Sequence, residues 1–241
     1  MRRAVILAGG PGTRLRPYTI VIPKPLMPIG DMPVVEVIIR QLRAAGFDRV
    51  ILAVGYLPDL FRALIGDGER MGGPIEFVRE EIPLGTAGAL GLIPGLDSDF
   101  LLINGDTLTT LDYRAFMEYH RKNGAIATIA TQCRQNPVDY GVLEIGADQR
   151  LTRYVEKPVQ TYHVSMGVNA FRADVLQYVQ PNRYLDIPQL MQVLMDNGQP
   201  VQCFQSDCFW LDIGRPADYE KALEVFQERR AEFLGNSSCG S

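Results

Sequence analysis

The first half of the chain alternates short apolar segments with segments of helical periodicity, and this alternation constrains the fold more than any other feature. The short segments are typical of strands, mostly buried ones, and we expect strands at residues 3–8, 49–54, 75–79 and 100–103. Helices are expected between and after them, at residues 33–45, 57–65, 86–93 and 112–123. Strands joined by helices predict a Rossmann-like α/β fold, in which helices cover both faces of a mixed, mostly parallel sheet.

The pattern changes after about residue 125, where short strands become more frequent. We expect strands at 125–131, 141–145, 150–156, 164–171, 200–205 and 208–212, and helices at 173–178, 186–197 and 216–233. No linker, internal repeat or low-complexity block separates the two halves. We therefore predict a single domain over residues 1–234, made of a first half (about 1–124) and a second half (about 125–234), and a disordered polar tail at 235–241.

Charge and hydropathy exclude several classes of partner. The chain has 24 Lys and Arg against 28 Asp and Glu, a net charge of −4, which argues against a nucleic-acid partner. No apolar run reaches the length of a membrane-spanning helix, and the apolar segment after Met1 is cut short by Gly9 and Gly10 before it could serve as a signal peptide. We expect no membrane association and a cytoplasmic location.

The reactive residues limit the possible chemistry. Cys133, Cys203, Cys208 and Cys239 form no CxxC pair and have no zinc-ligand spacing, so reduced thiols are expected. The chain has only two histidines, which argues against a His-based triad or a multi-histidine metal site. Chemistry in this chain is expected to depend on carboxylates, Lys, Arg and backbone groups.

The most informative segment runs from Leu7 to Pro28, directly after the first predicted strand. Gly9, Gly10 and Gly12 let backbone N–H groups approach an anion closely, and Arg14 and Lys24 add positive charge. The segment is not a dinucleotide-binding fingerprint, because Leu15 stands where the third glycine would be, and no Gly-Lys-Ser/Thr sequence follows. It predicts a phosphate-binding loop; the alternative is a glycine-rich turn with surface cations.

This segment resembles the signature of the sugar-1-phosphate nucleotidylyltransferases, GGxGxRLxPxTxxxPKPxxP, and matches every fixed position from Gly9 to Pro28. Further motifs follow in the family's order, at Pro83–Gly88, Asn104–Asp106, Val155–Pro158 and Trp210–Gly214. The sequence is most similar in appearance to bacterial mannose-1-phosphate and heptose-1-phosphate guanylyltransferases. The resemblance implies the nucleotide-diphospho-sugar transferase type of fold, with a nucleotide-binding first half and a sugar-phosphate-binding second half.

The implied reaction converts a nucleoside triphosphate (NTP) and a sugar 1-phosphate into an NDP-sugar and pyrophosphate, a step of nucleotide-sugar and polysaccharide biosynthesis. The attacking phosphate oxygen is already an anion, so catalysis requires mainly positioning and charge neutralisation. By resemblance, Arg14 grips the nucleotide phosphates, Lys24 lies near the transferred phosphate and Lys157 holds the sugar's phosphate. These three residues are the expected catalytic set.

The resemblance also assigns binding residues. The expected nucleotide-binding residues are Leu7, Gly9, Gly10, Gly12, Thr13, Arg14, Glu80, Gly85 and Asp106. The expected sugar-phosphate-binding residues are Gly141, Glu156, Lys157 and Ser165, although Glu156 could instead be a surface partner of Lys157, and Ser165 is shorter than the Asn that relatives often carry there. Asp106 and Asp212 are the expected Mg²⁺ ligands, since hard oxygen ligands suit this ion at a triphosphate; either could alone be a capping or turn residue.

The base preference is predicted from Glu80, five residues before Gly85, where thymidylyl relatives carry a Gln. A carboxylate only accepts hydrogen bonds, and guanine offers two adjacent donors, so GTP is favoured. In the alternative arrangement Glu80 faces solvent and Glu81 or backbone groups contact the base. Other functions left open are a uridylyl- or thymidylyltransferase of the same family, a nucleotidylyltransferase for a cofactor or choline phosphate, and a catalytically silent regulatory paralogue. The sugar is not specified by the sequence, and a homo-oligomer is possible.

Overall fold

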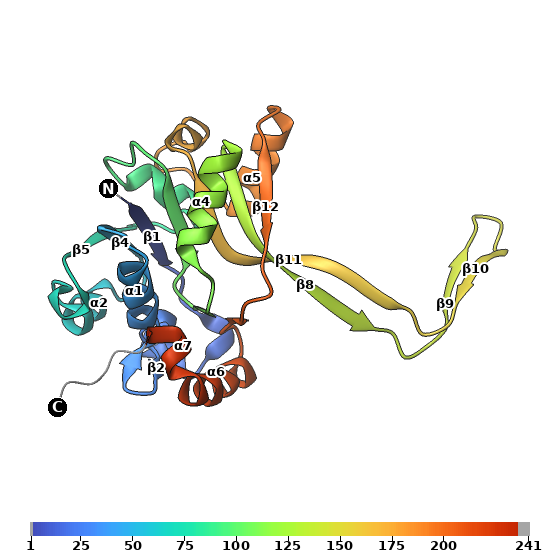
Figure 1. Ribbon diagram of the computed structural model, residues 1–241, viewed down its shortest axis with the longest axis horizontal. Coiled ribbons are helices and arrows are strands. Elements are labelled where there is room, and N and C mark those ends of the chain that lie inside the picture. The colour runs from blue at the N-terminus through green and yellow to red at the C-terminus, as the bar shows by residue number, and fades with distance from the viewer. Residues whose placement is uncertain (1, 236–241) are drawn as a thin grey trace.

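The computed structural model describes residues 2–235 and is built around one seven-stranded sheet (Figure 1). In the order β12-β8-β11-β6-β1-β4-β5, the strands are Val201–Gln205, Ala127–Pro137, Val159–Phe171, Phe100–Asn104, Arg3–Ala8, Arg49–Val54 and Ile75–Arg79. β1 pairs in parallel with β4 and β6, β4 with β5, and β12 with β8, whereas β11 is antiparallel to both β6 and β8. The predicted mixed, mostly parallel sheet is confirmed.

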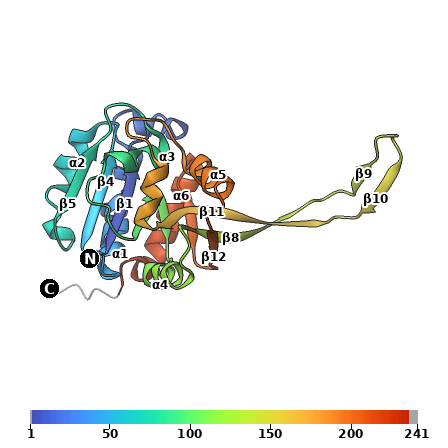
Figure 2. The ribbon, with the colours of Figure 1, turned by 90° about the horizontal axis from the view of Figure 1, so that it is seen from above.

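A hydrophobic core lies on each face of the sheet, because alternate residues of a strand point to opposite faces. Ala4 and Ile6 of β1 belong to the core formed with α1 (Val34–Ala44), α2 (Pro58–Ile65) and α4 (Tyr113–Asn123). Val5 belongs to the opposite core, formed with α3 (Gly85–Gly88) and α5 (Ile187–Asp196). Helices therefore cover both faces, as predicted (Figure 2).

A third hydrophobic cluster supports the loops beyond the end of β1. Leu15, Ile29, Phe226 and Phe233 are fully or almost fully buried in it. It also joins the short strand pair β2 (Pro28–Ile29) and β3 (Met32–Pro33) to α6 (Pro216–Glu228) and α7 (Arg230–Leu234). The last two helices were predicted as one helix over 216–233. The break at Arg229 lets Phe233 pack against both Phe226 and Phe209, each with ring centroids 5.7 Å apart.

The second half differs from the prediction at β8 and β11. Strands were expected at 125–131 and 164–171, but β8 continues to Pro137 and β11 begins at Val159. Their outer parts leave the sheet together, and the hairpin of β9 (Val142–Ile145) and β10 (Leu151–Val155) lies at the far end (Figures 1 and 2). The register of β8 and β11 is irregular between Ser165 and Asn169, which places a bulge where the paired strands leave the sheet.

Residues 2–235 bear only in part on the predicted cytoplasmic location and on the predicted disordered tail. Within residues 2–235, every helix is too short or too polar to cross a membrane; the cytoplasmic location stays a prediction. The tail predicted at 235–241 lies outside the described residues except for Gly235.

Candidate active site

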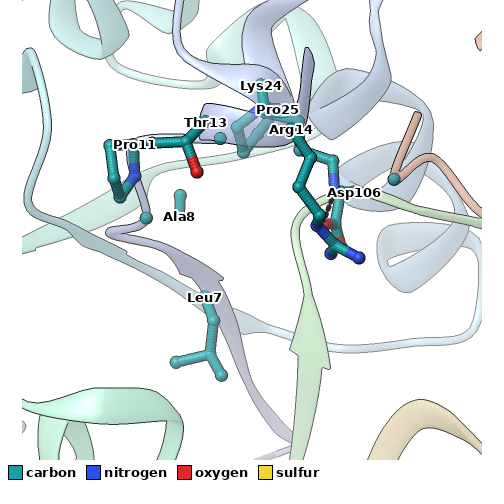
Figure 3. Close-up of a pocket in the computed structure, with 11 residues that line it drawn as sticks. Leu7, Ala8, Pro11, Thr13, Arg14, Lys24, Pro25 and Asp106 are labelled. Carbon is teal, nitrogen blue, oxygen red and sulfur yellow. Dashed lines mark hydrogen bonds and ion pairs between the residues drawn. The ribbon is translucent and has the colours of Figure 1, made fainter. Parts of the chain in front are cut away.

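A cleft opens at the carboxyl ends of β1 and β6, where open α/β sheets place ligands. It consists of two adjoining pockets that share Leu7, Gly10, Pro11 and Asp106. Together they are lined by all nine residues predicted to bind a nucleotide: Leu7, Gly9, Gly10, Gly12, Thr13, Arg14, Glu80, Gly85 and Asp106. In the first pocket, Arg14, Lys24 and Asp106 lie on the same side (Figure 3).

The loop after β1 has its shape fixed by local contacts. Gly12 has φ +60°, and a Cβ there would lie 3.1 Å from side-chain carbons of both Thr19 and Lys24. The Thr19 hydroxyl donates to the Gly12 carbonyl at 2.7 Å, and the buried Leu15 anchors the other end of the loop in the third cluster. Arg14, between these anchors, lines the pocket. The glycines predicted to form a phosphate-binding loop therefore border the cleft.

Strand pairing brings together Asp106, which lines the first pocket, and Asp212, which lines the adjoining pocket beside Arg14. β13 (Trp210–Asp212) pairs antiparallel with β7 (Thr107–Thr109), with Asp212 opposite Thr107, and the Ile213 N–H donates to the Asp106 carbonyl at 3.1 Å. The ammonium of the buried Lys24 forms an ion pair with Asp106 Oδ2 and lies 3.8 Å from Asp212 Oδ1. One cation thus stands between the two predicted metal ligands.

The charges of Asp106, Asp212 and Lys24 are compatible with the binding of a second cation. Burial raises the pKa of Asp212, and the nearby charge of Asp106 raises it further, whereas Lys24 and Arg14 oppose the shift. Asp106 Oδ1 is buried and has no hydrogen-bond partner among the described residues. Residues 2–235 contain no group of three or more His, Cys, Asp or Glu side chains suited to a metal. A metal at Asp106 and Asp212 would therefore need further oxygen ligands from substrate or water.

Glu80 lines the second pocket and lies immediately after β5. Its Oε2 accepts from the Leu84 N–H at 3.3 Å, and a Cβ on Gly9 would lie only 2.4 Å from its Oε1. Burial raises the pKa of Glu80, and the Leu84 hydrogen bond partly offsets this effect. The Glu80 side chain thus faces the cleft, whereas Glu81 is exposed and lines neither pocket.

Some residues of the cleft were not predicted. Thr86 and Asn104 line the second pocket, and their positions inside two of the recognised motifs could have identified them. Tyr184 lies in no motif that would have identified it. It reaches the pocket because the neighbouring Leu185 is held in place: the Leu185 N–H donates to the Leu84 carbonyl at 2.9 Å, and the Leu185 carbonyl accepts from the N–H groups of Ala87 and Gly88. An adjoining pocket beside Arg14 is lined by two further unpredicted cations, Arg134 and Arg215.

The predicted sugar-phosphate residues are not brought together at this cleft. Gly141 directly precedes β9, Glu156 and Lys157 directly follow β10, and none of the three lines either pocket. β9 and β10 lie at the far end of the β8–β11 extension (Figures 1 and 2). Ser165 pairs with Thr131 where the extension leaves the sheet. The Glu156 carboxylate accepts from the Tyr154 hydroxyl at 3.2 Å. Residues far apart in space cannot form one subsite within a single copy in this conformation.

Comparison with known proteins defines the class. The family model described as nucleotidyl transferase matches residues 3–229, and the chain belongs to this family. It is 32% identical to mannose-1-phosphate guanylyltransferase of Mycobacterium tuberculosis and 33% identical to UTP–glucose-1-phosphate uridylyltransferase of Synechocystis, over 90% and 92% of its length. The chain spans 62% of the length of each of these relatives.

Solved structures agree with this assignment. HddC from Yersinia pseudotuberculosis is similar with a TM-score of 0.72 and 30% identity, covering 94% of this chain and 100% of that one. The same protein complexed with GMP-PN gives a TM-score of 0.71 and 31% identity over the same shares of the two chains. The relatives that the chain matches bear the names of sugar-1-phosphate guanylyl- and uridylyltransferases, and the predicted fold type and family are confirmed.

Proposed function

We propose that the chain transfers a nucleotidyl group from an NTP, preferably GTP, to a sugar 1-phosphate, with release of pyrophosphate. One observation carries this proposal: nine residues chosen from separate motifs converge on one cleft. Its first pocket holds Arg14 and Lys24, which suit phosphates, and its second holds a carboxylate that suits a base with two donors. The cleft therefore has separate places for the two ends of a nucleotide.

The reaction requires little covalent chemistry from the protein. An oxygen of the sugar phosphate attacks the α-phosphorus in line, and the bond from the α-phosphorus to the bridging oxygen breaks as pyrophosphate leaves. Both reactants are anions, so their approach has to be made favourable by positive charge. Arg14 would hold the departing phosphates through its planar guanidinium, the glycine-rich loop would contribute N–H groups, and Lys24 would stabilise the transferred phosphate.

Magnesium fits the carboxylates of this cleft. The unpartnered, buried Asp106 Oδ1 and the neighbouring Asp212 provide the oxygen donors that this ion prefers. When bound, the ion would neutralise charge that develops on the phosphate oxygens. Lys24 now balances part of the carboxylate charge, so binding of metal and nucleotide would shift Lys24 from Asp106 toward the phosphates.

The preference for GTP rests on Glu80. Its carboxylate faces the second pocket, and the ring N–H and amino group of guanine are adjacent donors that one carboxylate can accept together. Uracil and thymine would place carbonyl oxygens against it, a buried mismatch that discriminates strongly. A uridylyl preference remains the alternative, because the Synechocystis relative bears a UTP-dependent name at similar identity. Mannose 1-phosphate is the first acceptor to test, since several relatives are named for it.

Pyrophosphate release with five NTPs against a panel of sugar 1-phosphates tests the proposal. Arg14→Ala serves as the matched control, because it removes a phosphate contact and leaves Leu15, which anchors the loop, in place. The proposal predicts activity that requires both substrates, is highest with GTP and is strongly reduced in Arg14→Ala. Activity that survives this substitution would remove Arg14 from the mechanism.

A further inference from the structure

The outer parts of β8 and β11, together with the hairpin between them, form an extension of residues 132–164 that we call the arm. β12 pairs with β8 only as far as Thr131, and β6 pairs with β11 only from Val168. Beyond these points the two strands pair only with each other, so both edges of the ribbon are open (Figure 1). Open edges readily pair with another chain.

The hairpin at the end of the arm has one apolar face. Leu143 lies opposite Tyr154 and Ile145 opposite Leu151, and cross-strand partners share a face. These four side chains are 48%, 60%, 60% and 58% exposed, in the order Leu143, Tyr154, Ile145, Leu151. The other face carries the Glu144–Arg153 ion pair at 3.1 Å. An isolated two-stranded hairpin is marginal in water, so this face requires a surface to pack against.

The exposed surface is large enough for a stable interface. Tyr140, Val159 and Tyr162 are also at least 48% exposed, which brings the arm to seven large exposed apolar side chains. At roughly 100 Å² each they present about 700 Å² in total, spread over both faces of the arm, because Val159 and Tyr162 lie three residues apart on β11. This area is close to the roughly 800 Å² that each partner contributes to a standard interface. A second copy of the chain offers the same area in return.

Charge connects the arm to the cleft. Around the cleft and the adjoining pocket, the four cations Arg14, Lys24, Arg134 and Arg215 are matched by the carboxylates of Glu80, Asp106, Asp212 and Asp218, and two anionic substrates would add more negative charge. The arm carries Lys157 next to the hairpin, with φ +44°, a left-handed conformation that costs free energy in a non-glycine residue. Such strain persists only where the structure requires it, which suggests that the Lys157 side chain has to point in a particular direction.

We propose that two copies of this chain exchange arms, so that each hairpin packs its apolar face on the other copy and each Lys157 reaches the cleft of the other copy. The role of Lys157 toward the sugar's phosphate rests on the proposed function, whereas the exchange of arms does not. The partner is a second copy because the same chain carries both Lys157 and the cleft that Lys157 does not reach within that chain. Mutual exchange of the two arms gives a closed dimer.

The oligomeric state tests the exchange independently of activity. Light scattering during gel filtration should give a dimer for the wild type and a monomer for Leu143→Asp/Ile145→Asp. The matched control is Glu144→Gln/Arg153→Gln, which changes the opposite face of the same hairpin and should remain dimeric. A monomeric wild type, or a dimer that survives Leu143→Asp/Ile145→Asp, would overturn the exchange.

Mixed dimers test whether Lys157 acts in the other copy. Arg14→Ala and Lys157→Ala chains are co-expressed and assayed at a sugar 1-phosphate concentration where each variant alone is impaired. In exchanged dimers, half of the molecules pair the two variants and retain one intact cleft, so activity should recover to about one quarter of the wild-type value. If Lys157 served the cleft of its own copy, no recovery would occur. An unchanged KM for the sugar 1-phosphate in Lys157→Ala would assign the sugar's phosphate to Arg134 and Arg215 instead. An inactive wild type would refute the proposed function but leave the gel-filtration result to decide the exchange.

Discussion

Asp106→Asn should lower the stability of the folded chain while preserving the fold, because it removes the charge that faces a buried ammonium. Lys24 is only 8% exposed and the Asp106 side chain 21%. Removing one partner of a buried ion pair costs about 3–5 kcal/mol. Asn keeps an acceptor oxygen, and Asp212 Oδ1 lies 3.8 Å from the same ammonium, so we expect about 2 kcal/mol. For a chain of this size, this corresponds to a decrease in Tm of roughly 4–8 °C.

Asp212→Asn is the matched comparison, and the sign of its effect should be opposite. A carboxyl group whose pKa is raised on folding contributes stability below its unfolded pKa and loses that contribution as pH rises through the folded pKa. Burial and the charge of Asp106 raise the pKa of Asp212, so its ionised form disfavours the folded state at neutral pH. Asp212→Asn should therefore raise Tm at pH 7, with the difference vanishing in acid.

Thermal unfolding followed by circular dichroism, with pyrophosphate release on the same samples, measures both effects. Both variants should lose most of kcat, because both carboxylates are proposed metal ligands. Asp106→Asn with an unchanged or higher Tm would refute the argument that Asp106 compensates the charge of Lys24. Asp212→Asn that destabilises as much as Asp106→Asn would show that the two carboxylates share that role.

Three further predictions concern substrates and metal. Chelation with EDTA should abolish turnover and added Mg²⁺ should restore it; robust activity in EDTA would contradict the metal assignment. Arg14→Ala should impair NTP use and kcat, whereas Lys157→Ala should chiefly raise KM for the sugar phosphate, and an effect of Lys157→Ala on NTP binding alone would reject that role. Because burial raises the pKa of Glu80, the affinity for GTP should fall as pH drops through that pKa in the wild type but not in Glu80→Gln. Glu80→Gln should also shift the preference toward dTTP or UTP. Parallel pH profiles of the two proteins would exclude Glu80 as the base contact.

The sequence predicted those parts of the cleft whose chemistry lies in contiguous motifs. The loop from Gly9 to Arg14 forms within a few residues of chain, so its composition alone indicated a phosphate-binding loop. Asp106 and Asp212 were paired only through resemblance, and the β7–β13 ladder is the physical reason that they meet. Tyr184 and Arg215 escaped prediction because they reach their pockets through tertiary packing that leaves no local pattern.

The arm shows a different limit of sequence reasoning. Strands β8, β9, β10 and β11 were expected near their observed positions, since alternation within each strand is a local property. Whether β8 and β11 end at the sheet or continue beyond it depends on the register between them and on the bulge between Ser165 and Asn169. Neither is encoded in the composition of a single segment, so Lys157 was expected at the cleft, whereas it follows β10 in the arm and does not line the cleft.

The most direct test of nucleotidyl transfer is kcat/KM for pyrophosphate release from each NTP, with and without mannose 1-phosphate, followed by the remaining sugar 1-phosphates. Release should depend on a sugar 1-phosphate and be most efficient with GTP, because Glu80 faces the second pocket. Release that is at least about ten times more efficient with UTP or dTTP than with GTP would contradict the role given to Glu80. The absence of pyrophosphate with every pair of substrates would contradict nucleotidyl transfer itself.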